Sequence, residues 1–531
     1  MSAKMFNLLT EAFITTTPLG PLTLPGVLAA LSRDEIEDFP ALRVHQGMFW
    51  HMFLVQLAAL TLHRAGKSDL PEDEETWCNF LRRLTPEYPD DEPWCLVVSD
   101  WSKPAFMQAA VPGGVRLENR IPSPDALDML ITAKNHDLKQ STARLANPED
   151  WLFALVSLQT GEGYGGRGNH GIARMNGGSS SRPMLTLAPV SGSAGRATTP
   201  RLGAWFLREV RVLIGTRNEV LERSNLDYAR SGGVGLTWLV PWPEKSQLRT
   251  RDLDIWFIEI CRRVRLGVRD GVLHGLKGTS EATRIDAKQF NGALDDPWAP
   301  VHKTENKSLT LSGGEFDYRR LTDLLFSGNW VTPILAQPSD IDVPGQTLAV
   351  VASALSRGNS KTEGFKSRVV PLTGRVTSAI GPRRAELHEL AKAQVETIAF
   401  LDRALGNALA LAAAEGNGAK DLSNYYDYTK PARTHFIRFA DEIFFHHLWA
   451  RFEAQDMGLD ARRAEEQAFA GRLWQRMQTI FEQSLPSMPC GSLFRPRAEA
   501  RARALLRGTV RKHYPDLLSI QQHVEAITDA A

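Results

Sequence analysis

The sequence predicts an α+β fold, with a large mixed N-terminal domain over residues 1–375 and a C-terminal four-helix bundle over residues 376–531. Three observations predict this arrangement. The chain of 531 residues is long enough for a large domain and a second, smaller one. Short apolar runs separated by turn residues fill the first part, and four long segments with apolar residues at helical spacing follow Gly381-Pro382.

The front of the chain predicts a short strand over residues 6–9 and a buried helix over residues 44–62, which carries apolar residues at helical spacing. Ser123-Pro124 pairs an N-cap residue with a first-turn proline, which predicts a helix to about residue 132. Asn147-Pro148 opens another helix that runs past Leu158 in the same way. Apolar runs near residues 238–240 and 256–260 indicate strands in the middle of the domain.

Two polar segments of this domain have the composition of binding loops. Residues 161–182 contain eight glycines and almost no apolar side chains, and so long an irregular segment is either disordered or functional. Within it, Gly163-Tyr164-Gly165-Gly166 allows a close approach of the backbone to a groove or phosphate, and Arg167, Arg174 and Arg182 flank it. The second segment, residues 357–364, is a polar turn before a strand predicted over residues 369–372.

The C-terminal helices are predicted over residues 383–414, 434–454, 461–484 and 496–513, as in a four-helix bundle. With Arg495 directly before it, the last one carries seven Lys and Arg side chains and a single acidic one, Glu499. Two interpretations of this basic stripe stay open: a solvated helix face, or a surface that meets phosphates or a partner.

The charge balance excludes a protein that attracts polyanions over its whole surface, because 62 basic and 61 acidic side chains leave a net charge of +1. The sum is uneven along the chain. Residues 1–100 hold 7 basic and 15 acidic side chains, whereas residues 151–250 hold 12 and 6, and residues 351–400 hold 8 and 4. The two basic stretches contain the two polar segments, which are therefore candidates for phosphate contact.

Several other classes find no support in the sequence. The four cysteines are far apart, the N-terminus does not look like a signal peptide, and no apolar run is long enough to span a membrane, so we expect a cytoplasmic protein without membrane contact. The G-x-G-x-x-G string that starts at Gly161 follows a helix instead of a strand, which argues against a dinucleotide site. We expect no cofactor, no metal and no catalytic residue.

Two alternatives remain beside a non-catalytic binding protein. His136, Asp137, Asn169 and His170 are the residue types of a metal-dependent nuclease, although their spacing matches no recognisable motif. The chain could also be a scaffold that binds only proteins through its helical bundle.

A set of segments in a fixed order resembles one family. These segments are FNLLTEAFI, LPGVLAALSRDEIEDFPALRVHQ, FLVQLAALTL, KNHDLK, GEGYGGRGNHG with NGGSSSRP, FDYRRLTDLLFSGNW and GNSKTEGFKSRVVPL, followed by the helical C-terminus. Together they resemble the CasA family, the large subunit of the type I-E CRISPR surveillance complex Cascade, over most of the chain.

The resemblance implies a non-catalytic subunit that recognises the protospacer-adjacent motif in double-stranded DNA, promotes strand separation and R-loop formation, and helps to recruit a helicase-nuclease. Its implied partners are the other Cascade subunits, the crRNA and the target duplex. The family's glycine loop, which contacts the minor groove, falls on Gly163, Tyr164, Gly165 and Gly166. Its wedge, a turn inserted beside the motif, falls on Asn359, Ser360 and Lys361.

Two further sites follow from the resemblance. The loop that docks the subunit onto the guide-bearing backbone falls on Lys134, Asn135, His136, Asp137, Leu138 and Lys139. A basic residue that contacts the motif is matched poorly, so that Arg284 and Lys288 are both candidates. The wedge here centres on Ser360 where some members have glutamine, and the cysteine cluster of some members is missing.

Overall fold

A computed structural model describes residues 4–128, 146–191, 199–342, 346–358, 361–515 and 517. The chain divides into two compact units. The first unit comprises residues 1–316 and 328–374, and the second comprises residues 317–327 and 375–531. The predicted division near residue 375 did not include the short segment 317–327 in the C-terminal unit.

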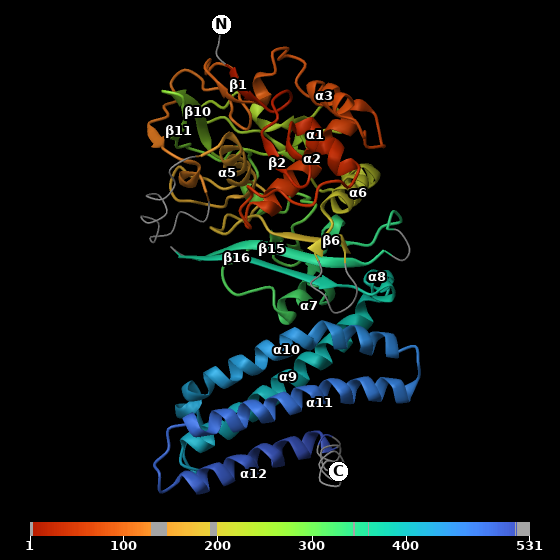
Figure 1. The fold of residues 1–531 in the computed structure, drawn as a ribbon, viewed down its shortest axis with the longest axis vertical. Helices are drawn as coiled ribbons and strands as arrows, with labels where there is room; N and C mark the ends of the chain where they lie inside the picture. Colours follow the sequence, from red (N-terminus) through yellow and green to blue (C-terminus); the bar gives the residue numbers. More distant parts are fainter. Residues whose placement is uncertain are drawn as a thin grey trace. The chain divides into compact units, whose positions relative to one another are not determined.

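The first unit combines helices with several small sheets (Figure 1). Its α-helices are α1 (Leu24–Ser32), α2 (Gly47–Ala65), α3 (Glu74–Arg82), α5 (Pro148–Gly161) and α6 (Leu202–Arg223). Its longer strands are β6 (Met184–Ser191), β9 (Leu253–Ile258), β10 (Arg263–Arg269), β11 (Val272–Gly278), β15 (Leu348–Gly358) and β16 (Lys361–Pro371).

The remaining strands are short. They are β1 (Lys4–Asn7), β2 (Ile14–Thr16), β3 (Gly20–Leu22), β4 (Cys95–Val98), β5 (Asn119–Ile121), β7 (Thr199–Pro200), β8 (Val234–Leu236), β12 (Val301–His302), β13 (Lys307–Ser308) and β14 (Trp330–Val331).

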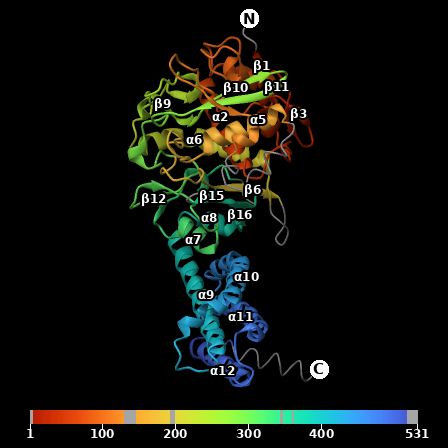
Figure 2. The ribbon, with the colours of Figure 1, turned by 90° about the vertical axis from the view of Figure 1, so that its left-hand side faces the viewer.

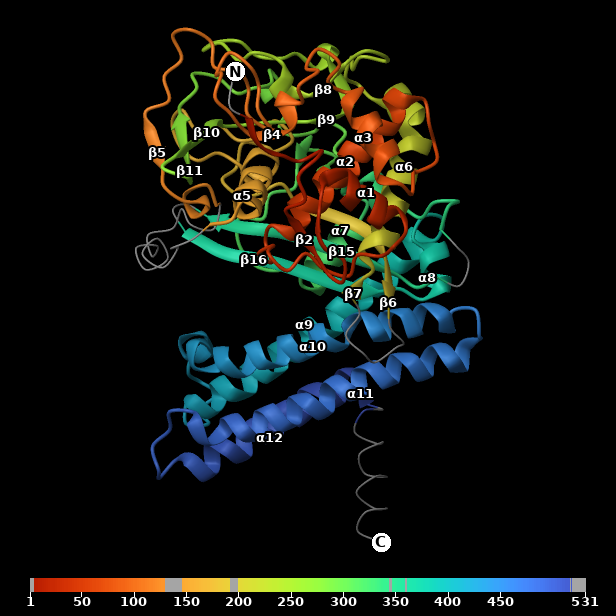
Figure 3. The same ribbon diagram turned by 45° about the horizontal axis from the view of Figure 1, so that its top comes forward.

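The largest sheet of the described residues has the antiparallel order β16-β15-β6-β7, and the strands β15 and β16 form its long hairpin (Figure 3). A second sheet has the order β10-β11-β5. The hairpin contains a register shift between Ser356 and Arg357, close to its turn. Such a bulge bends the strand locally and changes the direction of its end.

One continuous hydrophobic core fills the first unit, and α2 runs through it. Every residue from Met48 to Leu62 of this helix is buried, because α3, α5, α6 and β9 all pack against it. The aromatic rings of Trp50, Phe53 and Phe153 lie within this core, with Trp50 and Phe153 in an edge contact at 5.1 Å. These rings come from the helices α2 and α5, whose ribbons are labelled in Figure 2.

Two buried ion pairs lie in the first unit. Arg182 donates to both carboxylate oxygens of Asp296 at 2.6 and 3.0 Å, and Arg217 does the same to Asp254 at 2.9 and 2.8 Å. Removing one partner of such a pair would leave an isolated buried charge, which is costly. The pairs therefore fix how the strands and helices that carry them are joined.

The second unit is helical. It contains α7 (Tyr318–Phe326), most of α8 (Gly374–Ala379), α9 (Arg384–Ala413), α10 (Tyr426–Ala454), α11 (Leu459–Ser484) and α12 (Arg495–His513). The long helix α9 packs against α10, α11 and α12 (Figure 1). The predicted α+β class with a helical C-terminal region is thus confirmed. No helix in the described part of the chain is long and apolar enough to cross a membrane.

Two helices differ from the sequence prediction. The helix α10 begins at Tyr426, eight residues before the predicted start, and carries Pro431 inside it. The helix predicted from Pro124 to about residue 132 is a single 3-10 turn, Pro124–Ala126, within the described residues.

Candidate nucleic-acid interface

The helix α5 positions the glycine loop, which we define as Gly163 to Gly166. Its start is fixed by the predicted cap, in which Asn147 and Asp150 form a capping box. Its end lies against α2, where a β-carbon on Gly161 would come within 2.2 Å of the Phe49 ring. Only glycine permits this approach. The loop therefore leaves from a buried, rigid helix end.

Backbone hydrogen bonds hold the glycine loop against residues 178–181. The amide of Gly163 donates to Ser180 O at 3.1 Å, and the amide of Tyr164 donates to Gly178 O at 2.9 Å. A β-carbon on Gly163 would lie 2.3 Å from Gly178 O and 2.4 Å from Ser180 O. The glycine at this position is thus required by the neighbouring strand-like segment.

The outer part of the loop is open. The Tyr164 side chain is 43% exposed, and Gly165 is exposed as well. Gly166 has a φ of +109° with free space around its Cα, so the backbone turns there in a conformation that favours glycine. The amide of Asn169 closes the turn by donating to Gly166 O at 2.9 Å.

Of the three arginines that flank the loop, only Arg167 is at the surface. Arg174 and Arg182 are 1% and 2% exposed. Arg174 lies over the Phe257 ring and donates to Ile255 O at 3.0 Å, while Arg182 pairs with Asp296. The expectation that all three arginines flank a binding surface is therefore wrong for Arg174 and Arg182, whose side chains are bonded inside the protein.

The glycine loop opens onto a cleft of about 650 Å³. Residues 163, 164, 170–173 and 175–178 contribute one part of its lining, and Gln247, residues 281–283, residues 285–288 and Asn291 contribute the other. The side chain of Lys288 is exposed at this cleft. Two predicted sites that are more than a hundred residues apart in the sequence thus meet at one opening.

Arg284, the second basic candidate, lies inside the protein and is 1% exposed. Its guanidinium donates to Thr237 O at 2.9 Å and to Val240 O at 2.7 Å, and burial lowers its pKa to about 10. Its position anchors the segment that carries Lys288. Of the two basic candidates, only Lys288 has its charged group at the cleft.

The lining of the cleft includes residues that the sequence analysis did not identify as candidates. Gln247 donates through Nε2 to Thr283 Oγ1 at 2.8 Å, and the two chain segments are joined by a backbone bridge between Leu248 and Ile285. Neither segment carries a local motif, and only tertiary structure brings them to the glycine loop.

Other predicted site residues lie outside the described residues. These are Asn359 and Ser360 of the wedge and Lys134, Asn135, His136, Asp137, Leu138 and Lys139 of the docking loop. For Lys361 the backbone is described, and its Cα pairs with that of Gly358 across the hairpin.

Residues 178–181 connect the glycine loop to the hairpin that carries the predicted wedge. The Ser180 hydroxyl donates to Leu355 O at 2.7 Å, and the amide of Leu355 donates to the Ser181 hydroxyl at 2.8 Å. Because the same segment also accepts the Gly163 and Tyr164 amides, it lies between the loop and β15.

The residues of the nuclease alternative are described only in part. Asn169 and His170 lie beside the glycine loop, with the His170 ring 6.4 Å from that of Tyr164. Among the described residues, no group of three or more histidine, cysteine, aspartate or glutamate side chains could hold a metal ion.

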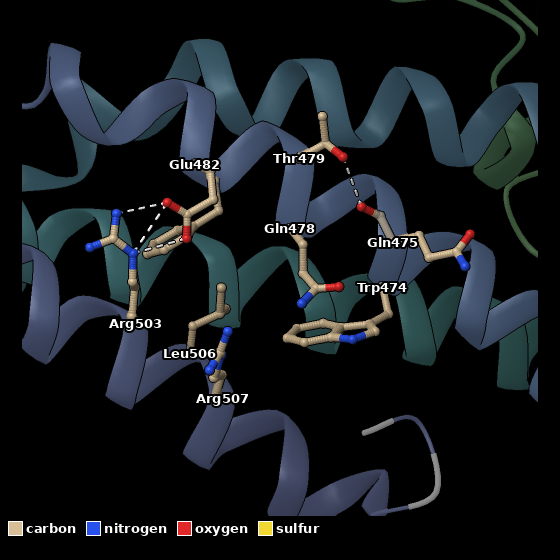
Figure 4. A pocket seen from close by; sticks show the side chains of 9 residues that line it. Trp474, Gln475, Gln478, Thr479, Glu482, Arg503, Leu506 and Arg507 are labelled. Atoms are coloured by element: carbon tan, nitrogen blue, oxygen red, sulfur yellow. Dashed lines mark hydrogen bonds and ion pairs between the residues drawn. The ribbon is translucent and has the colours of Figure 1, made fainter. Parts of the chain in front are cut away.

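The second unit has a groove of its own, of about 470 Å³, between α11 and α12 (Figure 4). Trp474, Gln478 and Arg507 line it, and the ion pair of Arg503 with Glu482 lies at one side. Two other basic side chains of α12 bind carbonyls in the connection that follows α9. Arg497 and Arg501 donate to the carbonyls of Glu415 and Gly416 at 3.1 and 2.7 Å.

Comparison with known proteins gives a clear result for structure and none for sequence. No protein-family model matches the chain, and no curated protein matches it. Solved structures do match over 96% of this chain. CasA (Cse1) of Thermus thermophilus is 14% identical, is covered completely and gives a TM-score of 0.58.

Two further structures agree. The CRISPR-associated protein Cse1 from Acidimicrobium ferrooxidans is 14% identical with 99% of its chain covered and a TM-score of 0.61. Cse1 of Thermobifida fusca is 14% identical with 98% of its chain covered, over 95% of this chain, and a TM-score of 0.59. The resemblance seen in the sequence is thus confirmed at the level of structure: the chain has the CasA (Cse1) fold.

Proposed function

We propose that the protein is the large, non-catalytic subunit of a crRNA-guided Cascade complex that recognises a protospacer-adjacent motif in double-stranded DNA. In this role it promotes strand separation and R-loop formation in the cytoplasm and helps to recruit a helicase-nuclease. Its partners are the other Cascade subunits, the crRNA and the target duplex.

One observation carries this proposal most directly. Gly163 and Tyr164 of the glycine loop line the same cleft as Lys288, which comes from a distant part of the chain. Exposed backbone groups can approach the minor groove closely, whose pattern separates A·T from G·C pairs but is otherwise degenerate. A positive charge beside them attracts phosphates. This combination suits tolerant recognition of a short motif.

No catalytic group is needed for such a role. Opening the first base pairs costs about 1 to 2 kcal/mol for each stacked step, which pairing with the guide largely returns. A turn inserted from the hairpin of β15 and β16, at Asn359, Ser360 and Lys361, would bias this exchange. Residues 134–139 would join the subunit to the guide-bearing backbone of the complex.

The glycine loop is tested by Gly165→Asp in a reconstituted complex. The new carboxylate adds a negative charge that repels phosphates at the exposed turn of the loop, and its β-carbon would lie 3.2 Å from Arg262 Nη2. We therefore expect at least about tenfold weaker binding of a motif-bearing duplex, with assembly intact. Gly113→Asp is the control for an added surface carboxylate, since Gly113 is also exposed and lies outside the glycine loop. Equal duplex affinity of the two variants would contradict the assignment.

Lys288 is tested by its salt dependence. If Lys288 neutralises one phosphate, Lys288→Ala lowers the slope of log affinity against log salt concentration by about one unit. Lys303→Ala serves as the control, because Lys303 is an exposed lysine of the same unit that does not line the cleft. An unchanged slope for Lys288→Ala would remove Lys288 from the interface.

A further inference from the structure

A single buried carboxylate lies between the glycine loop and the hairpin of β15 and β16. Glu162 directly precedes the glycine loop and is 5% exposed. Its Oε1 atom accepts a hydrogen bond from Arg357 Nη1 at 3.2 Å and lies 3.6 Å from Arg262 Nη2. Arg357 and Arg262 are each 8% exposed, so all three charged groups are nearly excluded from water.

Each arginine of this cluster is attached to one of the two proposed DNA elements. Arg262 Nη2 donates to Gly163 O at 3.0 Å and so holds the first residue of the glycine loop. Arg357 is a residue of β15, next to the bulge and one position before Gly358, the last residue of that strand. The Glu162 carboxylate therefore connects the start of the loop with the end of the strand.

The neighbouring serines reinforce the same connection. Arg357 Nη1 also donates to Ser179 O, and the Ser179 hydroxyl donates to Arg357 O, both at 3.4 Å. The Ser180 hydroxyl adds its bond to Leu355 O at 2.7 Å. The loop, residues 178–181 and the end of β15 thus form one bonded layer, in which a shift of one part must move the others.

We propose that Glu162 is a positioning residue that, through Arg262 and Arg357, couples the glycine loop to the hairpin, so that duplex binding at the loop places the hairpin for strand opening. This inference rests on the proposed function. It adds that duplex binding and strand opening are coupled, because binding at the glycine loop already places the hairpin beside the base pairs to be opened.

The test uses complete reconstituted complexes and two targets, a fully paired duplex and the same duplex with mismatches that pre-melt the first base pairs beside the motif. The measured quantity is the rate of R-loop formation on the fully paired duplex divided by the rate on the pre-melted duplex. Glu162→Gln keeps the size and one acceptor oxygen but removes the charge. We expect this ratio to fall about tenfold, the size typical of coupling between two sites.

Arg357→Gln is expected to give the same fall, and the double variant to lose no more than either single variant, because both changes break one connection. The control is Asp254→Asn, which breaks the buried pair of Arg217 and Asp254 in the same unit. It matches the loss of a buried ion pair without touching the loop or the hairpin, and it should leave the ratio unchanged.

An unchanged ratio in Glu162→Gln, or an equal slowing on both targets, would overturn the coupling. If the Glu162→Gln complex does not assemble, the same ratio is measured for Ser180→Ala and judged by the same criterion. This variant removes the hydrogen bond from the Ser180 hydroxyl to Leu355 O. A parent complex that binds no motif-bearing duplex would instead overturn the proposed function itself, so the two failures are distinguishable.

Discussion

Gly163 and Gly215 show how differently two glycines of one unit are constrained. A β-carbon on Gly163 would overlap two carbonyl oxygens, at 2.3 and 2.4 Å, whereas Gly215 is an exposed position within α6 with free space around it. The first glycine is needed by the close backbone contact that shapes the loop. The second only weakens its helix.

This contrast predicts opposite stability changes. Gly163→Ala should lower the free energy of unfolding by about 1–3 kcal/mol, because the new methyl group forces residues 178–181 away. Gly215→Ala should raise it by about 0.5–1 kcal/mol, because alanine loses less backbone entropy in a helix. Urea unfolding of both variants checks the pair, and a Gly163→Ala protein as stable as the parent would contradict the loop geometry.

Glu259 is a buried acid behind the cleft, and it accepts a hydrogen bond from the amide of Ala173 at 2.6 Å. Burial raises its pKa from 4.5 to about 7, although the amide of Ala173 and the charge of Arg174 act in the opposite direction. The folded protein therefore keeps a proton between these values that the unfolded chain has already released.

The sign of the pH dependence follows from this difference. The contribution of Glu259 to stability is complete below pH 4.5 and is lost as the pH rises through 7, by at most about 3 kcal/mol. Glu259→Gln should remove this dependence, so its stability relative to the parent should be higher at pH 8 than at pH 5. Unfolding measurements at the two pH values test this, and an equal difference at both would contradict it.

The sequence showed which residues were charged but not which of them were buried. Arg174, Arg182 and Arg284 have the composition of a phosphate-binding surface when only their neighbours in the chain are considered. Each is nearly inaccessible because carbonyls, carboxylates or aromatic rings from distant segments surround it. Lys288 could be separated from Arg284 only once the cleft was known.

At the scale of elements, periodicity predicted the helices better than the strands. The four long helices were all found, but α10 begins before its predicted start and carries Pro431 near its N-terminus. A proline can be accommodated near the start of a helix at the cost of one hydrogen bond. Of the hairpin, only a strand over residues 369–372 was predicted. The polar residues in β16 made it difficult to recognise that this strand is eleven residues long.

The basic helix α12 provides a prediction about elements. Arg501 Nη1 donates to the carbonyl of Gly416 at 2.7 Å, in the connection that follows α9. Arg501→Met should therefore destabilise the bundle by about 1 kcal/mol, because that carbonyl loses its charged donor. Arg511→Met is the control on the same helix, since the described residues show no hydrogen bond or ion pair of Arg511. Equal melting temperatures would show that the basic stripe is only solvated.

At the scale of the whole molecule, the second unit includes α7, whose sequence lies between the two chain segments of the first unit. Tyr318 of α7 stacks on Phe444 at 4.7 Å, and Phe326 meets Trp449 at 6.3 Å. The amide of Tyr318 donates to Asp441 Oδ1 at 2.6 Å. This arrangement could not be predicted from the sequence, because helical periodicity does not indicate which distant helix a segment contacts.

We therefore expect a fragment of residues 375–531 to be incompletely stable. Joining residues 316–328 to its N-terminus through a long flexible linker should raise its free energy of unfolding by at least about 2 kcal/mol, because aromatic and leucine side chains are buried again. The same fusion with Leu321→Asp is the control, since Leu321 is fully buried. If both fusions were as stable as the bare fragment, α7 would not belong to this unit.

The second unit contains a segment that lies between the two segments of the first unit, and this determines the order in which the units can fold during synthesis on the ribosome. The helix α7 is synthesised 123 residues before Asp441, its partner in α10, and the hairpin of β15 and β16 is made in between. The first unit can thus form its large sheet before α10 is synthesised, when the apolar face of α7 has no helix to pack against. During that interval the nascent chain exposes the apolar face of α7. We therefore expect its binding by chaperones to be greatest between the synthesis of residue 374 and the synthesis of α10.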